Sequence, residues 1–207
     1  EEAIKVSIRD IVKVDEKYYG IPYNAYVTGM IYNIELFKET GLVDEKGRPI
    51  YPTNFEELRD TAIAIKEKTG QAGFAFPTID RQGGWMFMSM AWSFGVDFME
   101  KIDGKWQATF DSPEMVEVLE YIRDLKWKYD VLPENILMSR ADLYQLFSTD
   151  RVAMMYAADD WVNGMVGAYN LDKNNVSNSP VPAGEGGACA LMGGDIWVIS
   201  NNSTQEQ

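Results

Sequence analysis

The chain has no histidine and only one cysteine, and these two shortages remove most enzyme chemistry from consideration. Without histidine there can be no Ser-His-Asp or Cys-His catalytic group and no zinc site with histidine ligands. The one thiol, Cys189, lies among small residues and cannot form a disulfide within the chain. We expect a buried structural thiol, because a reactive one needs an exposed, electropositive setting.

Long apolar runs and phosphate-binding loops are missing as well. No segment approaches the roughly 20 apolar residues that span a bilayer, and the first residues lack the basic and apolar regions of a signal peptide. The Gly-rich segments 83–84, 184–187 and 193–194 lack the strand-to-helix context of a dinucleotide site, and the segment from Asp172 departs from a calcium loop at Val176. We expect no cofactor, no metal and no signal sequence in these residues.

Basic residues are few compared with acidic ones. The chain carries 19 Lys and Arg against 32 Asp and Glu, which gives a net charge of −13. Nucleic acids and anionic membranes favour clusters of Lys and Arg, so the charge argues against both as partners. The simplest interpretation of the excess acid is solubility.

Aromatic residues, in contrast, are abundant, with six Trp, eleven Tyr and nine Phe. Such rings stack on the C–H faces of sugars while nearby polar groups bind the hydroxyls. We expect Trp106, in a hairpin, to be a packing residue and Trp92 to lie close to the core. Trp127, on an amphipathic helix, is expected to pack either in the core or on the surface. Trp85 and Trp161 fall at junctions before helices, where α/β proteins place ligand contacts. They are therefore candidate site residues, and we expect removal of Trp161 to spare the fold.

Helix and strand signals alternate along the chain, which predicts an α/β fold. Extended segments are predicted at 21–32, 74–76, 152–156 and 196–200, and Asp103-Gly104 predicts a hairpin. Residues 4–14 fit either helix or strand. Helices are predicted after an Asn33 cap, after a capping box of Thr53 and Glu56, over 85–94, from a Ser112-Pro113 start, over 142–147, and from Trp161 after an Asp160 cap.

The order of these elements resembles the second lobe of a known family, the family 1 extracellular solute-binding proteins of ABC importers, which are maltose-binding-protein-like. Residues 18–42, YYGIPYNAYVTGMIYNIELFKETGL, resemble the strand that carries the chain from one lobe to the other. The sequences FDSPE, LFSTDRVAMMY and GG before the last strand follow in the family's order. Residues 158–161 read Ala-Asp-Asp-Trp, where the family often has Gly-Pro-Trp. This chain therefore carries charge at a place where many relatives have none.

This resemblance implies a fold and a domain organisation. The expected fold is a periplasmic-binding-protein-like (type II) lobe, a mixed sheet flanked by helices, within a piece of a two-lobe protein. Residues 1–28 would be a remnant of the first lobe with the first hinge strand, 29–191 the second lobe, and 192–207 the second hinge strand. The protein would lie outside the cytoplasm, in the periplasm or as a lipoprotein at the cell surface, with the membrane permease as partner.

The resemblance also implies a ligand site in the cleft between the lobes, with backbone near Gly193 and Gly194 approaching the ligand. Tyr26 and Asp195 would face each other at the crossing of the hinge strands. The residues expected to contact the ligand are Tyr23, Asn24, Tyr26, Trp85, Trp92, Asp160, Trp161, Gly194 and Asp195.

Three functions stay open. The first is binding of a sugar or oligosaccharide without catalysis. The second keeps the fold and binds an organic cation, a polyamine or quaternary amine, through aromatic rings and the charges of Asp159, Asp160 and Asp195. The third is a glycoside hydrolase that pairs Asp159 and Asp160 with Asp195 or Glu185. Adjacent acids at a helix start are more often caps, which disfavours the third.

Overall fold

The computed structural model describes residues 9–204 and divides the chain into two compact units. Unit 2 contains residues 28–191, and unit 1 contains the residues before Thr28 and after Leu191. The chain therefore enters unit 2 at Thr28 and leaves it at Leu191. The predictions for residues 1–8 and 205–207 lie outside the described residues. The identification of these units with a lobe and two hinge strands stays a prediction.

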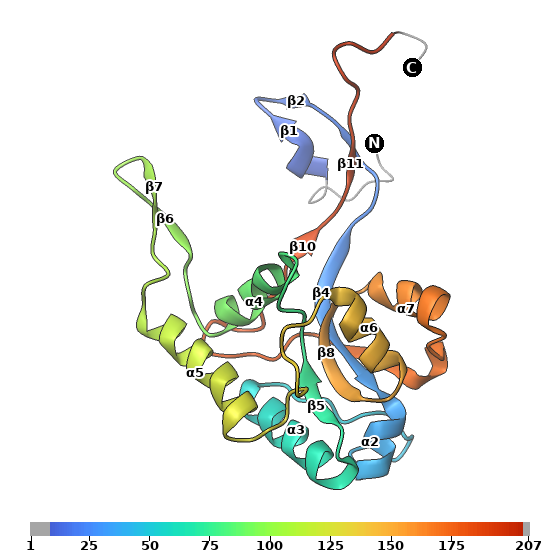
Figure 1. The fold of residues 1–207 in the computed structure, drawn as a ribbon. Coiled ribbons are helices and arrows are strands. Elements are labelled where there is room, and N and C mark those ends of the chain that lie inside the picture. The colour runs from blue at the N-terminus through green and yellow to red at the C-terminus, as the bar shows by residue number, and fades with distance from the viewer. Residues whose placement is uncertain (1–8, 205–207) are drawn as a thin grey trace. The chain divides into compact units, whose positions relative to one another are not determined.

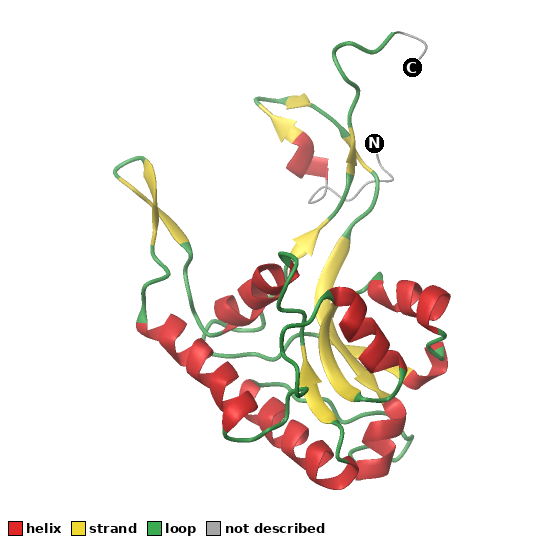
Figure 2. Ribbon diagram, viewed as in Figure 1, coloured by secondary structure: helices red, strands yellow, loops and turns green. Residues whose placement is uncertain are grey.

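Unit 2 is built on a mixed sheet with the strand order β9-β4-β8-β5 (Figures 1 and 2). β4 (Tyr26–Asn33) pairs antiparallel with β8 (Val152–Ala158) and with β9 (Val176–Ser179). β5 (Ala72–Ala75) runs parallel to β8. All seven residues of β8 are buried, as expected of a central strand covered on both faces.

Helices lie on both sides of this sheet (Figure 1). Their bounds are α2 Ile34–Thr40, α3 Phe55–Thr69, α4 Gln82–Ser93, α5 Pro113–Trp127, α6 Arg140–Ser148 and α7 Trp161–Tyr169, with a short 3-10 helix η2 at Lys173–Asn175. The largest fully buried side chains come from strands and helices together and include Tyr32, Phe37, Phe74, Phe147 and Tyr156. Because these side chains come from both kinds of element, the core lies between the sheet and its helices. Burial of each such side chain contributes about 1.5–3 kcal/mol to folding.

Several helix ends form where local sequence predicts them. The Asn33 side chain accepts a hydrogen bond from the Leu36 amide at 3.0 Å, which caps α2. Ser112 accepts one from the Met115 amide at 3.3 Å and stands before Pro113, the first residue of α5. Gly41 ends α2 in the left-handed conformation, with φ at 76°.

Two predicted caps are wrong. The capping box of α3 is shifted by one residue, because Asn54 is the cap and accepts the Glu57 amide at 2.9 Å, while the Glu57 carboxylate accepts the Thr53 amide at 2.7 Å. Asp160 precedes α7, but its φ of −74° and ψ of −15° are already helical, and its side chain makes no capping hydrogen bond. A side-chain cap needs an extended residue at this position.

Strand ends also differ from the prediction. The extended segment 21–32 is two strands, β3 (Ile21–Pro22) and β4, and the last strand, β11, covers only Ile196–Trp197. Between β3 and β4 the strand pairing is interrupted, because Pro22 has no amide hydrogen to donate. There the Asp195 backbone amide donates to the Asn24 side chain instead of to a backbone carbonyl. The helix predicted over 142–147 begins at Arg140, after a capping box formed by Ser139 and Asp142.

The predicted hairpin is present but does not pack. β6 (Met99–Ile102) and β7 (Lys105–Ala108) pair across a turn in which Asp103 and Gly104 have φ of 50° and 78°. The hairpin extends away from the rest of unit 2 (Figure 1), and all its strand residues are exposed. Trp106 is 65% exposed, so the prediction that it is a packing residue is wrong. Trp127 is 76% exposed, which excludes the core and leaves the surface alternative.

Unit 1 consists of short pieces of chain. They are the 3-10 helix η1 (Asp10–Val12) and the strands β1 (Lys13–Val14), β2 (Lys17–Tyr18), β3, β10 (Met192–Gly193) and β11. β1 pairs with β2, β3 with β11, and β10 with the first two residues of β4. Many of its large apolar side chains are exposed, among them Tyr18, Tyr19, Ile21, Tyr23, Trp197, Val198 and Ile199.

Candidate ligand-binding residues

Asn24 and Asp195 in unit 1 bind each other although 171 positions separate them. The Asn24 amide nitrogen donates to a carboxylate oxygen of Asp195 at 2.8 Å, and the Asp195 backbone amide donates to the Asn24 side-chain oxygen at 2.8 Å. The Tyr23 amide also donates to the Asp195 carbonyl oxygen at 2.8 Å. These bonds hold the segment around Asn24 and the segment around Asp195 together. The Asn24 and Asp195 side chains stay exposed.

Tyr26 lies opposite Gly193 in the pairing of β4 with β10. A Cβ atom on Gly193 would lie 2.4 Å from the Tyr26 hydroxyl oxygen, so a larger residue here would displace the Tyr26 ring. Gly194 is close to backbone in the same way, since its Cβ would lie 2.3 Å from the Asn24 carbonyl oxygen. The crossing therefore joins Tyr26 to Gly193 and Asn24 to Asp195.

A recess of ≈ 220 Å³ surrounds this crossing in unit 1. It is lined by Ile11, Pro22, Asn24, Ala25, Met192, Gly193, Gly194, Asp195 and Ile196. Small-molecule pockets usually measure roughly 300–1,000 Å³, so the recess has room for part of a ligand. Three predicted site residues line it, Asn24, Gly194 and Asp195. Ile11 and Met192 also line it, and no local sequence signal identified them.

Unit 2 brings Trp85 and Trp161 together. Trp85 stands in the first turn of α4 and Trp161 is the first residue of α7, and their ring centroids are 6.4 Å apart with the planes tilted by 33°. Tyr144 from α6 meets the Trp161 ring edge-on at 5.5 Å, and Tyr169 meets Tyr144 at 5.7 Å. We call Trp85, Tyr144, Trp161 and Tyr169 the aromatic group. Sequence reasoning missed the two tyrosines, because only the packing of α6 on α7 brings them here.

A positive charge already lies on the aromatic group. The Arg140 guanidinium carbon is 5.7 Å from the Trp161 ring centroid and 5.8 Å from that of Tyr144, within the range of cation–π attraction. Burial raises the pKa of Tyr144, and the charge of Arg140 opposes that rise only in part. The Tyr144 hydroxyl is therefore neutral at physiological pH and can donate a hydrogen bond.

Burial separates the candidate residues of unit 2. Trp161 is 3% exposed, Trp85 is partly exposed, and Asp160 is exposed. Trp161 therefore belongs to the packed interior, and the expectation that its removal spares the fold is wrong. Trp92 lies at the other end of α4 and packs edge-on against Phe98 at 6.2 Å, apart from the aromatic group.

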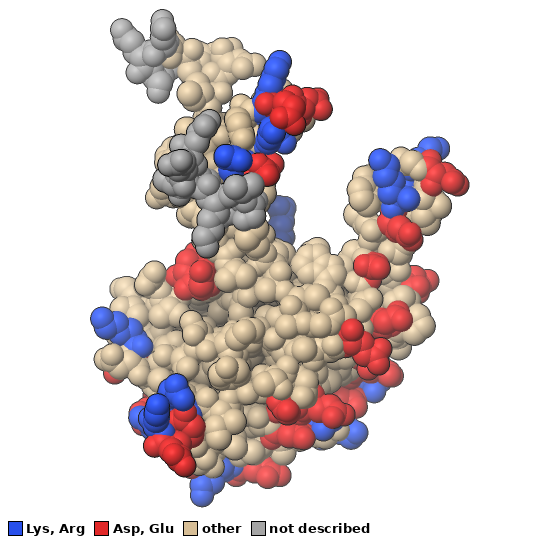
Figure 3. Space-filling view, turned by 180° about the vertical axis from the view of Figure 1, so that it is seen from behind, with Lys and Arg blue, Asp and Glu red and all other residues tan. Residues whose placement is uncertain are grey.

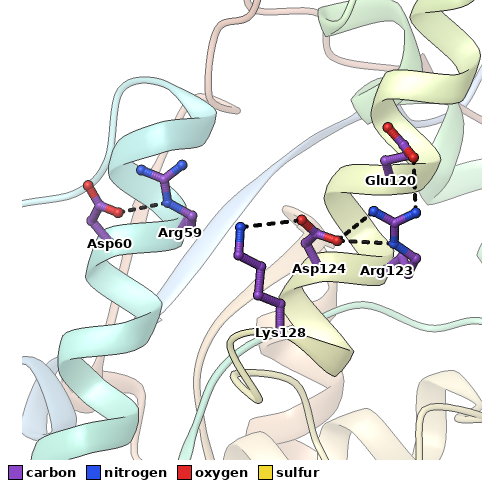
Figure 4. Close-up of polar contacts among 6 residues, drawn as sticks. All are labelled: Arg59, Asp60, Glu120, Arg123, Asp124 and Lys128. Carbon is purple, nitrogen blue, oxygen red and sulfur yellow. Dashed lines mark hydrogen bonds and ion pairs between the residues drawn. The ribbon is translucent and has the colours of Figure 1, made fainter.

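Other charged residues of unit 2 form surface pairs. On the face shown in Figure 3, acidic side chains spread over the helices with basic ones between them. The pairs on α3 and α5 in Figure 4 join Arg59 to Asp60, Arg123 to Glu120 and Asp124, and Lys128 to Asp124. Exposed pairs of this kind contribute about 0–1 kcal/mol each, and we assign them no role in binding.

Two structural features are absent from residues 9–204, the part of the chain that the structure describes. Within this range no three Cys, Asp or Glu side chains are gathered as a metal site would require. No helix in the same range is long and apolar enough to cross a membrane. Cys189, predicted to be buried, is partly exposed, and its thiol contacts the Gly186 carbonyl oxygen at 3.3 Å.

The chain matches known proteins over most of its length. The family model for "Bacterial extracellular solute-binding protein" matches residues 2–207. The arabinooligosaccharide-binding protein of Halalkalibacterium halodurans is 27% identical over 198 residues, which cover 93% of this chain and 42% of that protein.

Solved structures show the same fold. An ABC transporter solute-binding protein from Thermotoga lettingae, bound to α-D-tagatose, superposes with a TM-score of 0.81 at 23% identity. Maltose-bound MalE3 of T. maritima superposes with a TM-score of 0.79 at 24% identity. Each match covers 98% of this chain and 50% of the other, so the chain spans about half the length of its relatives.

These matches confirm the predicted α/β periplasmic-binding-protein-like fold. The matched family is a non-catalytic one, which confirms the prediction that the chain is not an enzyme. The chain belongs to the bacterial extracellular solute-binding proteins.

Proposed function

We propose that this chain is part of the solute-binding component of an ABC importer and that its solute is a sugar or oligosaccharide. The observation that carries the proposal is the aromatic group, in which Trp85 and Trp161 lie 6.4 Å apart at the starts of two helices. Trp85 is partly exposed and supported from behind by a buried ring, as a platform for the C–H face of a sugar requires. The arabinooligosaccharide-binding relative supports the same ligand class.

Each unit carries one kind of sugar contact. Unit 2 has the aromatic group and the exposed Asp160 beside it, and unit 1 has the exposed amide and carboxylate of Asn24 and Asp195. Amide and carboxylate groups accept and donate hydrogen bonds in the pattern that sugar hydroxyls need. We therefore keep Tyr23, Asn24, Tyr26, Gly194 and Asp195 of unit 1 as proposed ligand-binding residues.

The same proposal keeps Trp85 and Asp160 of unit 2 as ligand contacts and gives Trp161 the role of the buried ring behind Trp85. Trp92 is proposed as a supporting residue, because its ring packs on Phe98 rather than on the aromatic group. We also propose that the protein acts outside the cytoplasm, in the periplasm or lipid-anchored at the surface, and delivers its solute to a membrane permease. The family description as extracellular supports this location.

The organic-cation alternative rests on Asp160, an exposed acid beside the aromatic group. Arg140 argues against it. The guanidinium already lies over the Trp161 and Tyr144 rings, so a second cation in this place would be repelled by like charge. A neutral sugar meets no such repulsion, and Arg140 can donate hydrogen bonds to its hydroxyls.

Calorimetric titration of the full-length protein against two groups of compounds tests the proposal. The first group is arabinotriose, maltose and tagatose, and the second is spermidine and choline. We expect saturable binding to at least one sugar, no binding to either amine, and no hydrolysis of the bound oligosaccharide. Saturable binding of an amine with no binding of any sugar would replace this proposal with the organic-cation alternative.

A further inference from the structure

A buried cluster of hydroxyl groups lies where the chain enters and leaves unit 2. Thr28 is the first residue of the unit and Leu191 the last. Ser89 comes from the middle of α4, and the Ser89 and Thr28 side chains are 0% and 2% exposed. Polar side chains are seldom buried this completely unless hydrogen bonds compensate them.

Thr28 is bonded to both neighbours. Its backbone amide donates to the Leu191 carbonyl oxygen at 2.9 Å, and the Leu191 amide donates to the Thr28 hydroxyl oxygen at 2.8 Å. The Thr28 hydroxyl is also 3.2 Å from the Ser89 hydroxyl and 3.3 Å from the Leu191 carbonyl oxygen. If Ser89 donates to Thr28 and Thr28 donates to Leu191, both hydroxyl groups and the Leu191 amide and carbonyl have partners.

A second serine, one turn later on α4, extends this contact. The Ser93 hydroxyl donates to the Ser89 carbonyl oxygen and accepts from the Cys189 amide, both at 3.0 Å. The Ser93 carbonyl oxygen accepts from the Gly186 amide at 2.9 Å. The segment from Gly186 to Leu191 is thus held on α4 at successive points just before the chain leaves unit 2.

These bonds link the exit of the chain to the helix that carries Trp85. α4 cannot shift against the Thr28–Leu191 pair without leaving a buried hydroxyl or amide without a partner, and such a loss costs free energy. Alanine or valine would fill the same space and tolerate a shift. The hydroxyl groups therefore specify one position of α4 relative to Thr28 and Leu191.

We propose that Thr28 and Ser89 are positioning residues that couple the place of α4 to the two points at which the chain passes out of unit 2. The role of α4 in ligand binding rests on the proposed function, whereas the coupling itself does not. A shift of α4 when Trp85 meets a solute would then alter the pairing of Thr28 with Leu191. Thr28 and Ser89 thus position α4 and are not assigned a contact with the solute.

Residue-resolved amide hydrogen exchange by NMR tests the coupling without any ligand. Ser89→Ala removes a hydroxyl from α4 but none of the atoms that join Thr28 to Leu191. We expect the Leu191 amide to exchange about tenfold faster in this variant, and faster still in Thr28→Val, which removes the hydroxyl oxygen that the Leu191 amide bonds. Thr28→Ser, which keeps the hydroxyl, should exchange like the wild type.

Tyr32→Phe is the matched control. It removes a buried hydroxyl from the other end of β4, where the Tyr32 hydroxyl lies 2.6 Å from that of Ser179. Exchange at Leu191 that is equal in Ser89→Ala and Tyr32→Phe would overturn the coupling. Arabinotriose supplies the second readout, with an expected severalfold faster dissociation from Ser89→Ala alone. Failure of the wild type to bind any sugar would refute the proposed function and leave the exchange result to decide the coupling.

Discussion

The two units differ most in how they treat large apolar side chains. Unit 2 buries a core of them completely around its central strand, as for Tyr32, Phe74 and Tyr156, and leaves others exposed, such as Trp106 and Trp127. Unit 1 leaves many of them in solvent, and Ile21 and Ile199 are 63% and 80% exposed. Hydrophobic burial is the main term that stabilises a fold, so the sequence of unit 2 accounts for its own stability. The exposed apolar side chains of unit 1 do not form a core of their own and would be stabilised if other residues covered them.

The candidate site residues follow the same division. Trp161 in unit 2 is part of a packed interior, whereas Asn24 and Asp195 in unit 1 are exposed and joined only to each other and to nearby backbone. A substitution in the aromatic group therefore tests fold and binding together. A substitution at the crossing in unit 1 tests polar contacts with little effect on a core.

Trp161→Ala should have the largest effect. Removal of a 3%-exposed indole leaves a cavity beside Tyr144, and large-to-small changes of this kind cost about 3–5 kcal/mol of unfolding free energy. Urea denaturation followed by circular dichroism measures the loss. Trp127→Ala, at a 76%-exposed indole, is the control and should change stability by less than about 0.5 kcal/mol. Equal, small losses in both variants would contradict the burial of Trp161.

Self-association of the 207-residue chain should be the next largest effect. The exposed apolar side chains of unit 1 offer a surface for a second copy, and β3 and β11 are short strands with open edges. Sedimentation velocity should show association that weakens about tenfold, or roughly 1.4 kcal/mol, in Trp197→Ser combined with Ile199→Ser. Trp127→Ser in unit 2 should leave it unchanged. A chain that stays monomeric at high concentration would show that this surface is not adhesive.

Asp160→Asn should have a smaller effect that separates the ligand classes. For a neutral sugar, asparagine keeps one acceptor, so the affinity should fall by about 1 kcal/mol, equally at low and high salt. For an organic cation, the loss of charge should greatly weaken binding at low salt and less at high salt. Titrations of the full-length protein at two ionic strengths measure the difference.

The smallest effect concerns the pH dependence of α6. Hydrogen bonds from the Ser139 hydroxyl and amide lower the pKa of Asp142 from its ordinary value, so the folded state favours the charged carboxylate. The stabilisation is present above the unfolded-state pKa and is lost as the pH falls below about 4 through the lower folded-state value. Thermal unfolding should therefore show Asp142→Asn to be slightly less stable than the wild type at neutral pH, with the gap closing in acid. A gap that is unchanged at low pH would contradict this role of the capping box.

Local signals in the sequence predicted much of unit 2. Asn33, Ser112, Pro113 and Gly41 act within one turn of themselves, so their roles could be assigned without the fold. The buried strand β8 was visible as an apolar run for the same reason. The α3 cap was displaced by one residue because Thr53 and Asn54 are both good caps, and only the folded structure decides between them.

Long-range contacts could not be predicted in this way. No local pattern encodes the bond between Asn24 and Asp195 across 171 positions, or the arrival of Tyr144 and Tyr169 at the aromatic group. The exposure of Trp106 was missed because it depends on the hairpin extending away from the sheet. For Trp161, the position before a helix could be seen in the sequence, whereas its burial against Tyr144 of α6 could not.

The central claim is that the aromatic group of unit 2 binds a sugar, and Trp85 tests it most directly because it is partly exposed. The measurement is calorimetric titration of arabinotriose into the full-length wild type and into Trp85→Ala, with Trp127→Ala as the control for loss of a tryptophan. We predict saturable binding to the wild type and the control, and at least about thirtyfold weaker binding, roughly 2 kcal/mol, to Trp85→Ala. Equal affinity of Trp85→Ala and the wild type would contradict the account.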